Sequence, residues 1–263
     1  GCHNANFCFI GAPLMKGDEM ETDDNGTPIF KMWFIPKDQF EIVRTWDVAG
    51  MRGSGSDDVK VDGGIVPAKY TGIDLWTVPA HYSNPVYRMP TALRLAYNKA
   101  AIAIGIARGS LEVFADIAKN KIPMLTSASL ANRGIAQYRM GVAEATYRAS
   151  RAWLMESMTA VEDELTGNSD LPGAKTTQDA RLACTHAANE CMKVVDLLHN
   201  TAGTTGMRTY SPLERKLRDS HGAATHRWVA HPLYEDLGKI LLGIEPGPEF
   251  AGGTGAPVLA KPK

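Results

Sequence analysis

The sequence predicts an α+β protein in which a β-rich part precedes a large antiparallel bundle of α-helices. Residues 1–85 alternate short apolar runs with turn-forming segments, the pattern of strands joined by turns. From Thr91 the chain changes to long stretches rich in Ala, Leu, Met and Arg, which are good helix formers. Three of these stretches are about 30 residues long, well above the usual helix length, so we expect them to pack together as a bundle.

Each element follows from a local pattern. The expected strands lie at residues 7–10, 29–35, 59–62 and 63–66, with turns at 23–26 and 36–38 and a Pro-containing connector at 78–90. The expected helices lie near residues 91–120, 130–164, 175–203, 212–228 and 231–243. The residues after 243 are rich in Gly and Pro, which indicates an extended or disordered arm. The predicted domains are therefore 1–88, 89–243 and a tail at 244–263.

Composition narrows the class of protein. The chain has 263 residues, 44% of them hydrophobic, which is enough to bury a sizeable core. A net charge of −1 argues against a protein whose main partner is nucleic acid. Cys184 and Cys191 lie seven residues apart on one helix face and are interpreted as small core residues, and no Cys/His cluster has the spacing of a metal site. No signal peptide or membrane-length apolar run is visible, so we expect a cytoplasmic protein that does not bind a membrane.

Two segments of the sequence contain motifs that indicate a catalytic or cofactor-binding role. The helix at 212–228 contains Arg218-Asp219, followed eight residues later by His226-Arg227, and the segment 45–56 runs Thr-Trp-Asp-Val-Ala-Gly-Met-Arg-Gly-Ser-Gly-Ser. Together they resemble the acyl-CoA dehydrogenase superfamily. Its dehydrogenases commonly carry Tyr-Glu eight residues after Arg-Asp, and that Glu removes the substrate's α-proton. A histidine in this position resembles the two-component flavin-dependent monooxygenases built on the same scaffold, in which a histidine of this helix faces the flavin.

The resemblance covers nearly all of the chain and implies a fold and an activity. The fold would be a partial β-barrel followed by the helical bundle, and the superfamily's N-terminal helical domain has no counterpart here, so we expect an N-terminal portion to be missing. Reduced FMN or FAD would bind between barrel and bundle and react with O2 to give a C4a-hydroperoxide. That species would hydroxylate a small organic substrate, with an aromatic one favoured. The resemblance also implies a flavin reductase as partner and a homotetramer.

The same resemblance assigns the catalytic histidine. We prefer His226, because it stands in the position of the dehydrogenase base, although most histidines on helices have no catalytic role. Its imidazole titrates near neutrality and could hydrogen-bond a flavin peroxide or deprotonate a phenolic substrate. His221 lies five residues earlier, about 140° away around an ideal helix, and is the second choice.

The cofactor residues are assigned in two segments. On the match to the superfamily, Trp46 packs on the flavin ring, and Ser54, Gly55 and Ser56 contact the flavin. The loop 201–206 matches the superfamily's Gly-rich loop, so Gly203 and Thr204 would contact the pyrophosphate or adenosine end. Trp46 could instead be an ordinary core aromatic, and Gly203 could simply end a helix. Residues 119–126 lack the superfamily's Arg-x-x-Phe-Gly element, and the weaker flavin retention that this implies suits an oxygenase supplied with reduced flavin.

Three other readings stay open. Arg218 and Asp219 could be mainly structural, with Asp219 in an i,i+4 pair with Arg215. The chain could also be a true acyl-CoA dehydrogenase or flavin oxidase whose base comes from another helix, since Glu162, Glu164 and Glu190 are available. Alternatively it could be a non-catalytic helical assembly module. A module without a site should not be stabilised by flavin, whereas ligand binding must stabilise a protein that has one.

Overall fold

The computed structural model describes residues 1–24, 26, 28–70, 81–167 and 171–244. These residues form two compact units, one from residues 1–48 and 52–70, the other from residues 49–51 and 81–244. The predicted turn at 23–26 and the connector at 78–90 lie partly outside the described residues, and the predicted tail lies outside them after Ile244. The domain limits at 88 and 243 stay a prediction.

The first unit contains short antiparallel strand pairs. β1 (Phe7–Pro13) pairs with β4 (Phe30–Pro36), β2 (Met15–Lys16) with β3 (Glu19–Met20), and β5 (Glu41–Val43) with β6 (Asp58–Lys60). Single 3-10 turns lie at Cys2–Asn4, Lys37–Gln39, Arg52–Ser54 and Ala68–Tyr70. Phe9 and Phe34 face each other across β1 and β4, with ring centroids 4.7 Å apart. The described part of this unit therefore holds three separate two-stranded sheets and no closed barrel, as expected of a partial one.

One expected strand, at residues 63–66, is wrong. Gly63 has φ +65°, a left-handed conformation that interrupts an extended chain, and Ile65 is 82% exposed. The apolar Ile65 and Val66 therefore have no neighbouring strand to pack on, and the pairing ends with β6 at Lys60.

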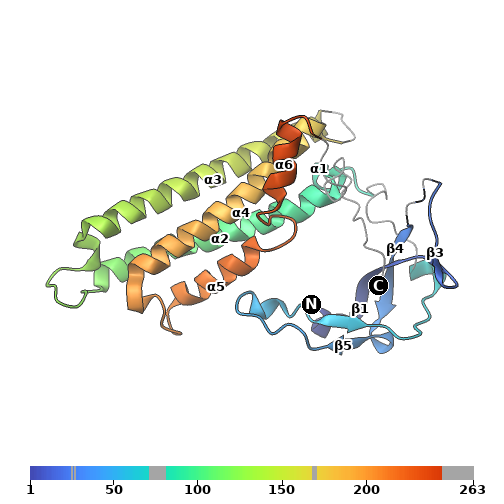
Figure 1. Ribbon diagram of the computed structural model, residues 1–263, viewed down its shortest axis with the longest axis horizontal. Helices are drawn as coiled ribbons and strands as arrows, with labels where there is room; N and C mark the ends of the chain where they lie inside the picture. Colours follow the sequence, from blue (N-terminus) through green and yellow to red (C-terminus); the bar gives the residue numbers. More distant parts are fainter. Residues whose placement is uncertain (25, 27, 71–80, 168–170, 245–263) are drawn as a thin grey trace. The chain divides into compact units, whose positions relative to one another are not determined.

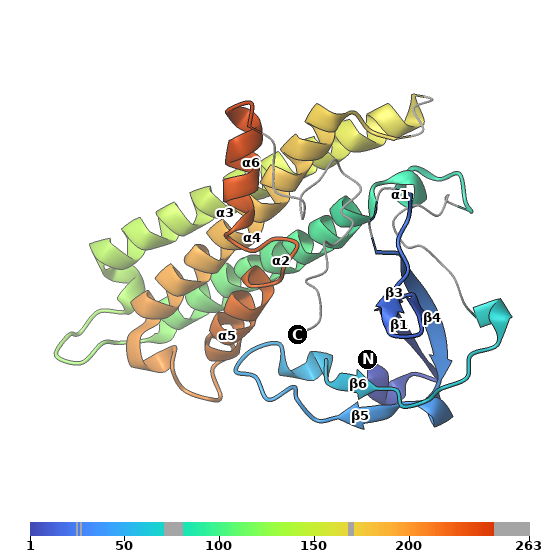
Figure 2. The same ribbon diagram turned by 45° about the vertical axis from the view of Figure 1, so that its right-hand side comes forward.

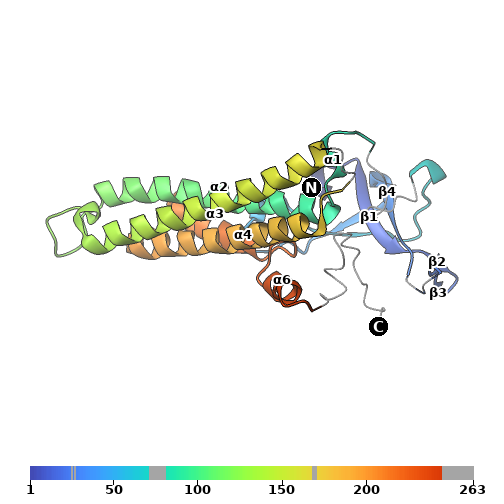
Figure 3. The same ribbon diagram turned by 90° about the horizontal axis from the view of Figure 1, so that it is seen from above.

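The second unit is the predicted helical bundle. Its helices are α1 (Pro85–Arg88), α2 (Thr91–Asn120), α3 (Gly134–Thr166), α4 (Ala174–Ala202), α5 (Pro212–Ala224) and α6 (Leu233–Leu241), with 3-10 turns at Leu130–Asn132 and Gly203–Thr205. The three long helices run side by side (Figures 1 and 3), with α4 packed against both α2 and α3. The shorter α5 lies along α2 and α4 (Figure 2).

Small residues allow this close packing. Ala96, Ala100, Ala103 and Ala107 recur on the buried face of α2 and are at most 2% exposed, so the backbones of neighbouring helices can approach closely. Cys184 and Cys191 are buried on α4, which confirms them as core residues, and burial raises the pKa of each thiol to about 12. The helix starts and ends match the predicted ones within a few residues except at the end of α5.

Candidate functional site

His226 lies just after α5 and not on it. The prediction of a helix to residue 228 is wrong, because α5 ends at Ala224, where the Thr225 N–H donates to the carbonyl of His221. A turn follows, closed by a 2.9 Å hydrogen bond from the Val229 N–H to the carbonyl of His226. The helical angle of about 140° between the two histidines therefore does not describe their geometry.

A buried valine and an asparagine on α4 cause this ending. Val229 is fully buried, and its carbonyl accepts a 3.0 Å hydrogen bond from Nδ2 of Asn189, which is itself buried on α4. Anchoring Val229 in the core turns the chain away from the helical path and leaves His226 at the bend. Asn189 was missed from the sequence, although an asparagine within the Ala- and Cys-rich face of α4 is a usable signal.

The surroundings of His226 favour the neutral form of its imidazole. The pKa of His226 lies below its ordinary value, first because the ring is partly desolvated and second because the positive charge of Lys99 on α2 is near. The Trp228 N–H donates to Nδ1 of His226 at 3.3 Å. A neutral imidazole whose Nδ1 accepts a hydrogen bond carries its proton on Nε2, so the ring presents an Nε2–H donor. No spacing in the sequence could have brought Lys99 and His226 together.

His221 pairs with an aspartate on α4. Its Nε2 lies 2.8 Å from Oδ1 of Asp196 on α4, and both side chains are substantially exposed. This surface pair links α5 to α4 and gives His221 a structural role.

Arg218 and Asp219 bind the backbone of residues 49–51. Oδ1 of Asp219 accepts the N–H of Met51 at 2.7 Å, and the Arg218 guanidinium donates to the carbonyl of Ala49. Arg218 also holds Glu214 through two hydrogen bonds of 2.6 and 2.9 Å. The expected Arg215–Asp219 ion pair is therefore wrong, because the carboxylate of Asp219 points to a backbone amide instead.

The first unit holds the other predicted flavin segment. Trp46 is half-buried, and its backbone N–H and that of Thr45 donate to Oδ1 of Asp57 at 2.7 and 2.8 Å. His3 lies 2.6 Å from the other carboxylate oxygen. These hydrogen bonds, that to Trp46 first, lower the pKa of Asp57 to about 2. Asp57 and His3 were missed, because neither stands in a motif.

Ser54, Gly55 and Ser56 present donors suited to a flavin. The two serine hydroxyls lie 3.4 Å apart, both residues are exposed, and Gly55 has φ +52°. Hydroxyl and backbone N–H donors match the carbonyl and phosphate oxygens of a flavin. The chemistry of this segment therefore fits the implied cofactor.

Gly203 and Thr204 are exposed at the end of α4. Gly203 is the C-cap residue, with φ +58°, as the structural reading predicted. Lys121, from the segment without the Arg-x-x-Phe-Gly element, donates from Nζ to the carbonyl of Ala202 at 2.6 Å. A Cβ on Gly203 would lie 3.4 Å from that Nζ. The loop thus combines open glycine backbone with a cation, a combination that suits an anionic group.

The carboxylates considered as alternative bases have partners of their own. Glu164 accepts the Gly173 N–H at 2.6 Å and a hydrogen bond from Thr176, which lowers its pKa. Glu190 pairs with Lys193 at 2.6 Å. A carboxylate with a lowered pKa is a poor proton acceptor, so Glu164 does not suit the role of a base.

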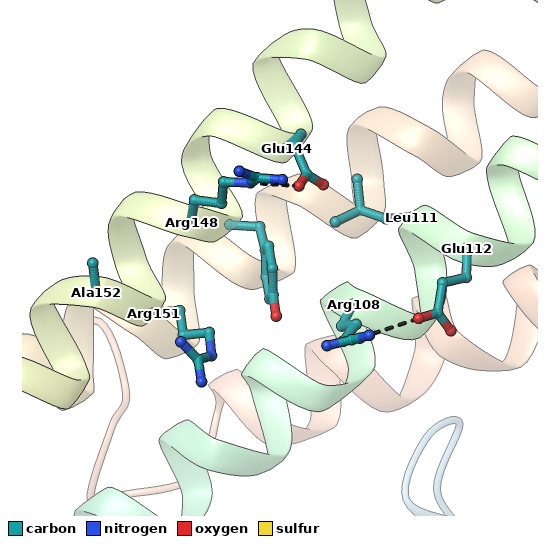
Figure 4. Close-up of a pocket in the computed structure, with 8 residues that line it drawn as sticks. Arg108, Leu111, Glu112, Glu144, Arg148, Arg151 and Ala152 are labelled. Atoms are coloured by element: carbon teal, nitrogen blue, oxygen red, sulfur yellow. Dashed lines mark hydrogen bonds and ion pairs between the residues drawn. The ribbon is translucent and has the colours of Figure 1, made fainter.

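A groove of about 560 Å³ lies between α2 and α3 (Figure 4). Its charges are largely paired within each helix, Arg108 with Glu112 at 3.1 Å and Arg148 with Glu144 at 2.6 Å. None of the residues predicted for the site lines it. Across the described part of the chain, no group of three or more His, Cys, Asp or Glu side chains could hold a metal ion, and no helix is long and apolar enough to cross a membrane.

Comparison with known proteins gives one family and a consistent set of relatives. Residues 97–231 match the model of the acyl-CoA dehydrogenase C-terminal domain. The chain is 29% identical to an indole-3-acetate monooxygenase of Acinetobacter baumannii over 250 residues, covering 95% of the chain and 62% of that protein. It is 26% identical to the oxygenase component of p-hydroxyphenylacetate 3-hydroxylase from the same species, covering 94% of the chain and 59% of that protein.

The fold also matches solved structures. The structure of XiaF from Streptomyces sp. in complex with FADH2 and glycerol superimposes with a TM-score of 0.77 at 18% identity, covering 98% of this chain and 63% of that one. The chain therefore has the acyl-CoA dehydrogenase fold and spans about 60% of the length of the relatives that it matches.

Proposed function

The chain belongs to the acyl-CoA dehydrogenase family, through the C-terminal domain of that family, and from this premise we propose that it is the oxygenase component of a flavin-dependent monooxygenase. The observation that carries the proposal is His226, whose imidazole presents an Nε2–H donor at the position that, on the resemblance in sequence, holds the glutamate base of the dehydrogenases. The names of the two relatives, a monooxygenase and an oxygenase component, support the same activity.

The cofactor in this proposal is reduced FMN or FAD. When bound, it supplies two electrons to O2, so that one oxygen atom enters the substrate and the other leaves as water. Trp46 would pack on the ring, and Ser54, Gly55 and Ser56 would hydrogen-bond it. Gly203 and Thr204 would hold the phosphate end, with the charge of Lys121 beside them.

His226 acts in this proposal as a hydrogen-bond donor. Because the Trp228 N–H occupies Nδ1, the imidazole can donate from Nε2 to an oxygen atom without changing its tautomer. Removing a phenolic proton at Nε2 would require the ring to shift its own proton to Nδ1 and lose that bond. The geometry thus favours the donor role over the base role.

The partners follow from the same proposal. A separate flavin reductase would supply reduced flavin, and the substrate would be a small aromatic compound, as the names of the relatives suggest.

A homotetramer is supported by one face of α3, on which Ile135, Tyr138 and Val142 are each at least 39% exposed, since neighbouring exposed apolar side chains mark association surfaces. The cytoplasmic location stays a prediction.

Anaerobic mixing with reduced FMN or FAD, followed by O2, tests the proposal by stopped-flow absorbance. We expect a transient species absorbing in the near ultraviolet before oxidised flavin appears. If oxidised flavin instead forms directly, at its rate in free solution, the chain is not an oxygenase, and acyl-CoA substrates would be tested next.

A further inference from the structure

Residues Ala49–Met51 are fixed to α5 by a set of contacts that we call the 49–51 anchor. It comprises the Met51 N–H on Oδ1 of Asp219 at 2.7 Å, the carbonyl of Ala49 on Arg218, and Gly50 against the peptide of Arg218. A Cβ on Gly50 would overlap the carbonyl oxygen of Arg218, so only glycine fits there. The loop and the helix are therefore in backbone contact.

The backbone conformation shows that the anchor is specific. Met51 has φ +56°, a conformation that side-chain-bearing residues adopt only where their surroundings impose it. A Cβ on Gly222 would lie 2.9 Å from Cγ of Met51, so a second glycine makes room for this side chain. Gly50 thus allows the loop backbone to contact α5, and Gly222 makes room for the side chain of Met51.

Charged side chains of α5 form the anchor. Glu214 holds the Arg218 guanidinium through two hydrogen bonds, which leaves Nη1 directed at the carbonyl of Ala49. Asp219 is half-buried and uses its carboxylate on a backbone N–H rather than on a cation of its own helix. Both charged side chains therefore act on the backbone of the same three residues, 49–51.

The position of the anchor in the chain gives it a role. Trp46 lies three residues before Ala49, Ser54 lies three residues after Met51, and His226 follows α5 directly. We propose that Asp219 and Arg218 are positioning residues, which fix the backbone of residues 49–51 to α5 and so restrain the conformation of the segment 46–56, whose flanking residues Trp46 and Ser54 are assigned to the flavin. This inference rests on the proposed function.

The test compares Asp219→Ala and Gly50→Ala with Asp219→Asn, whose carboxamide oxygen can still accept the Met51 N–H. The matched control is Asp196→Ala, which removes the partner of His221 from the same face of the bundle and leaves the anchor intact. Two quantities are measured: hydrogen exchange of the Met51 amide without flavin, and the Kd for reduced FMN and FAD under anaerobic conditions.

We expect Asp219→Ala and Gly50→Ala to speed exchange of the Met51 amide and to weaken flavin binding at least about tenfold. Asp219→Asn and Asp196→Ala should stay within a few-fold of the wild type in both measurements. Faster exchange at Met51 with unchanged flavin affinity would overturn the inference alone. Absence of flavin binding by the wild-type protein would overturn the proposed function, and the inference with it.

Discussion

At the scale of single residues, the backbone decides what each candidate side chain can do. The Trp228 N–H sets the tautomer of His226, and the Thr45 and Trp46 N–H groups set the charge of Asp57. His221 has the same side chain as His226, but an aspartate holds it at the surface. Residue type alone therefore did not separate the two histidines, whereas their hydrogen-bond partners do.

Replacing His226 by alanine should slow substrate hydroxylation by about 10²- to 10⁴-fold, the usual contribution of a positioned proton donor or acceptor. His221→Ala is the control and should change the rate little, because it removes only an exposed pair with Asp196. Steady-state product formation with a fixed supply of reduced flavin measures both variants. Similar losses in the two would refute the assignment of His226.

Asp57 should make the protein sensitive to acid. Its folded pKa of about 2 lies below the ordinary value of 3.8, so the unfolded chain takes up a proton first as the pH falls. The stabilisation is therefore complete above about pH 4 and is lost between pH 4 and 2. Asp57→Asn should be less stable than the wild type in urea at pH 7, with the difference shrinking below pH 4.

The control for Asp57 is Asp62→Asn, since the side chain of Asp62 is 89% exposed and pairs only loosely with Lys60. The stability of Asp62→Asn in urea should match that of the wild type at each pH. An Asp57→Asn variant as stable as the wild type at pH 7 would show that the carboxylate does not hold the Thr45–Trp46 backbone.

At the scale of elements, α5 shows how local and distant signals combine. Its start is local: Ser211 accepts the Leu213 N–H on its side chain at 3.3 Å, and Pro212 occupies the first helical position. Its end is not local, because the burial of Val229 and the hydrogen bond from Asn189 pull the chain out of the helix. The start is therefore readable from sequence and the end is not.

Ser211→Ala should destabilise the protein by about 1 kcal/mol, the usual cost of losing an N-cap acceptor. Ser211→Thr keeps a hydroxyl and should retain most of the stability. Urea unfolding of the three proteins measures the differences. If Ser211→Ala unfolds at the wild-type urea concentration, the cap does not stabilise α5.

At the scale of the whole molecule, the bundle places α4 at its centre and leaves α3 exposed on one side. The buried faces of α2 and α4 are lined with small residues, while one face of α3 exposes Ile135, Tyr138 and Val142. Association of copies would bury the part of these side chains that a single chain leaves exposed.

Light scattering on the purified protein should therefore give a mass about four times the 28.5 kDa of the chain. Tyr138→Glu, on α3, should lower that mass by placing a charge on the apolar face. Tyr82→Glu changes an exposed tyrosine outside α3 and should leave the mass unchanged. A monomeric wild type would contradict the homotetramer.

The sequence by itself determined the change from short strands to long helices near residue 91, the approximate limits of α2 and α4, and the register that singles out His226. Helix propensity, apolar periodicity and glycine caps act over a few residues, so they can be read locally. Only the tertiary structure decided the end of α5, the partner of Asp219 and the neutral tautomer of His226. Those depend on contacts such as that between Met51 and Asp219, which are 168 positions apart, and such distant contacts leave no periodic pattern in the chain.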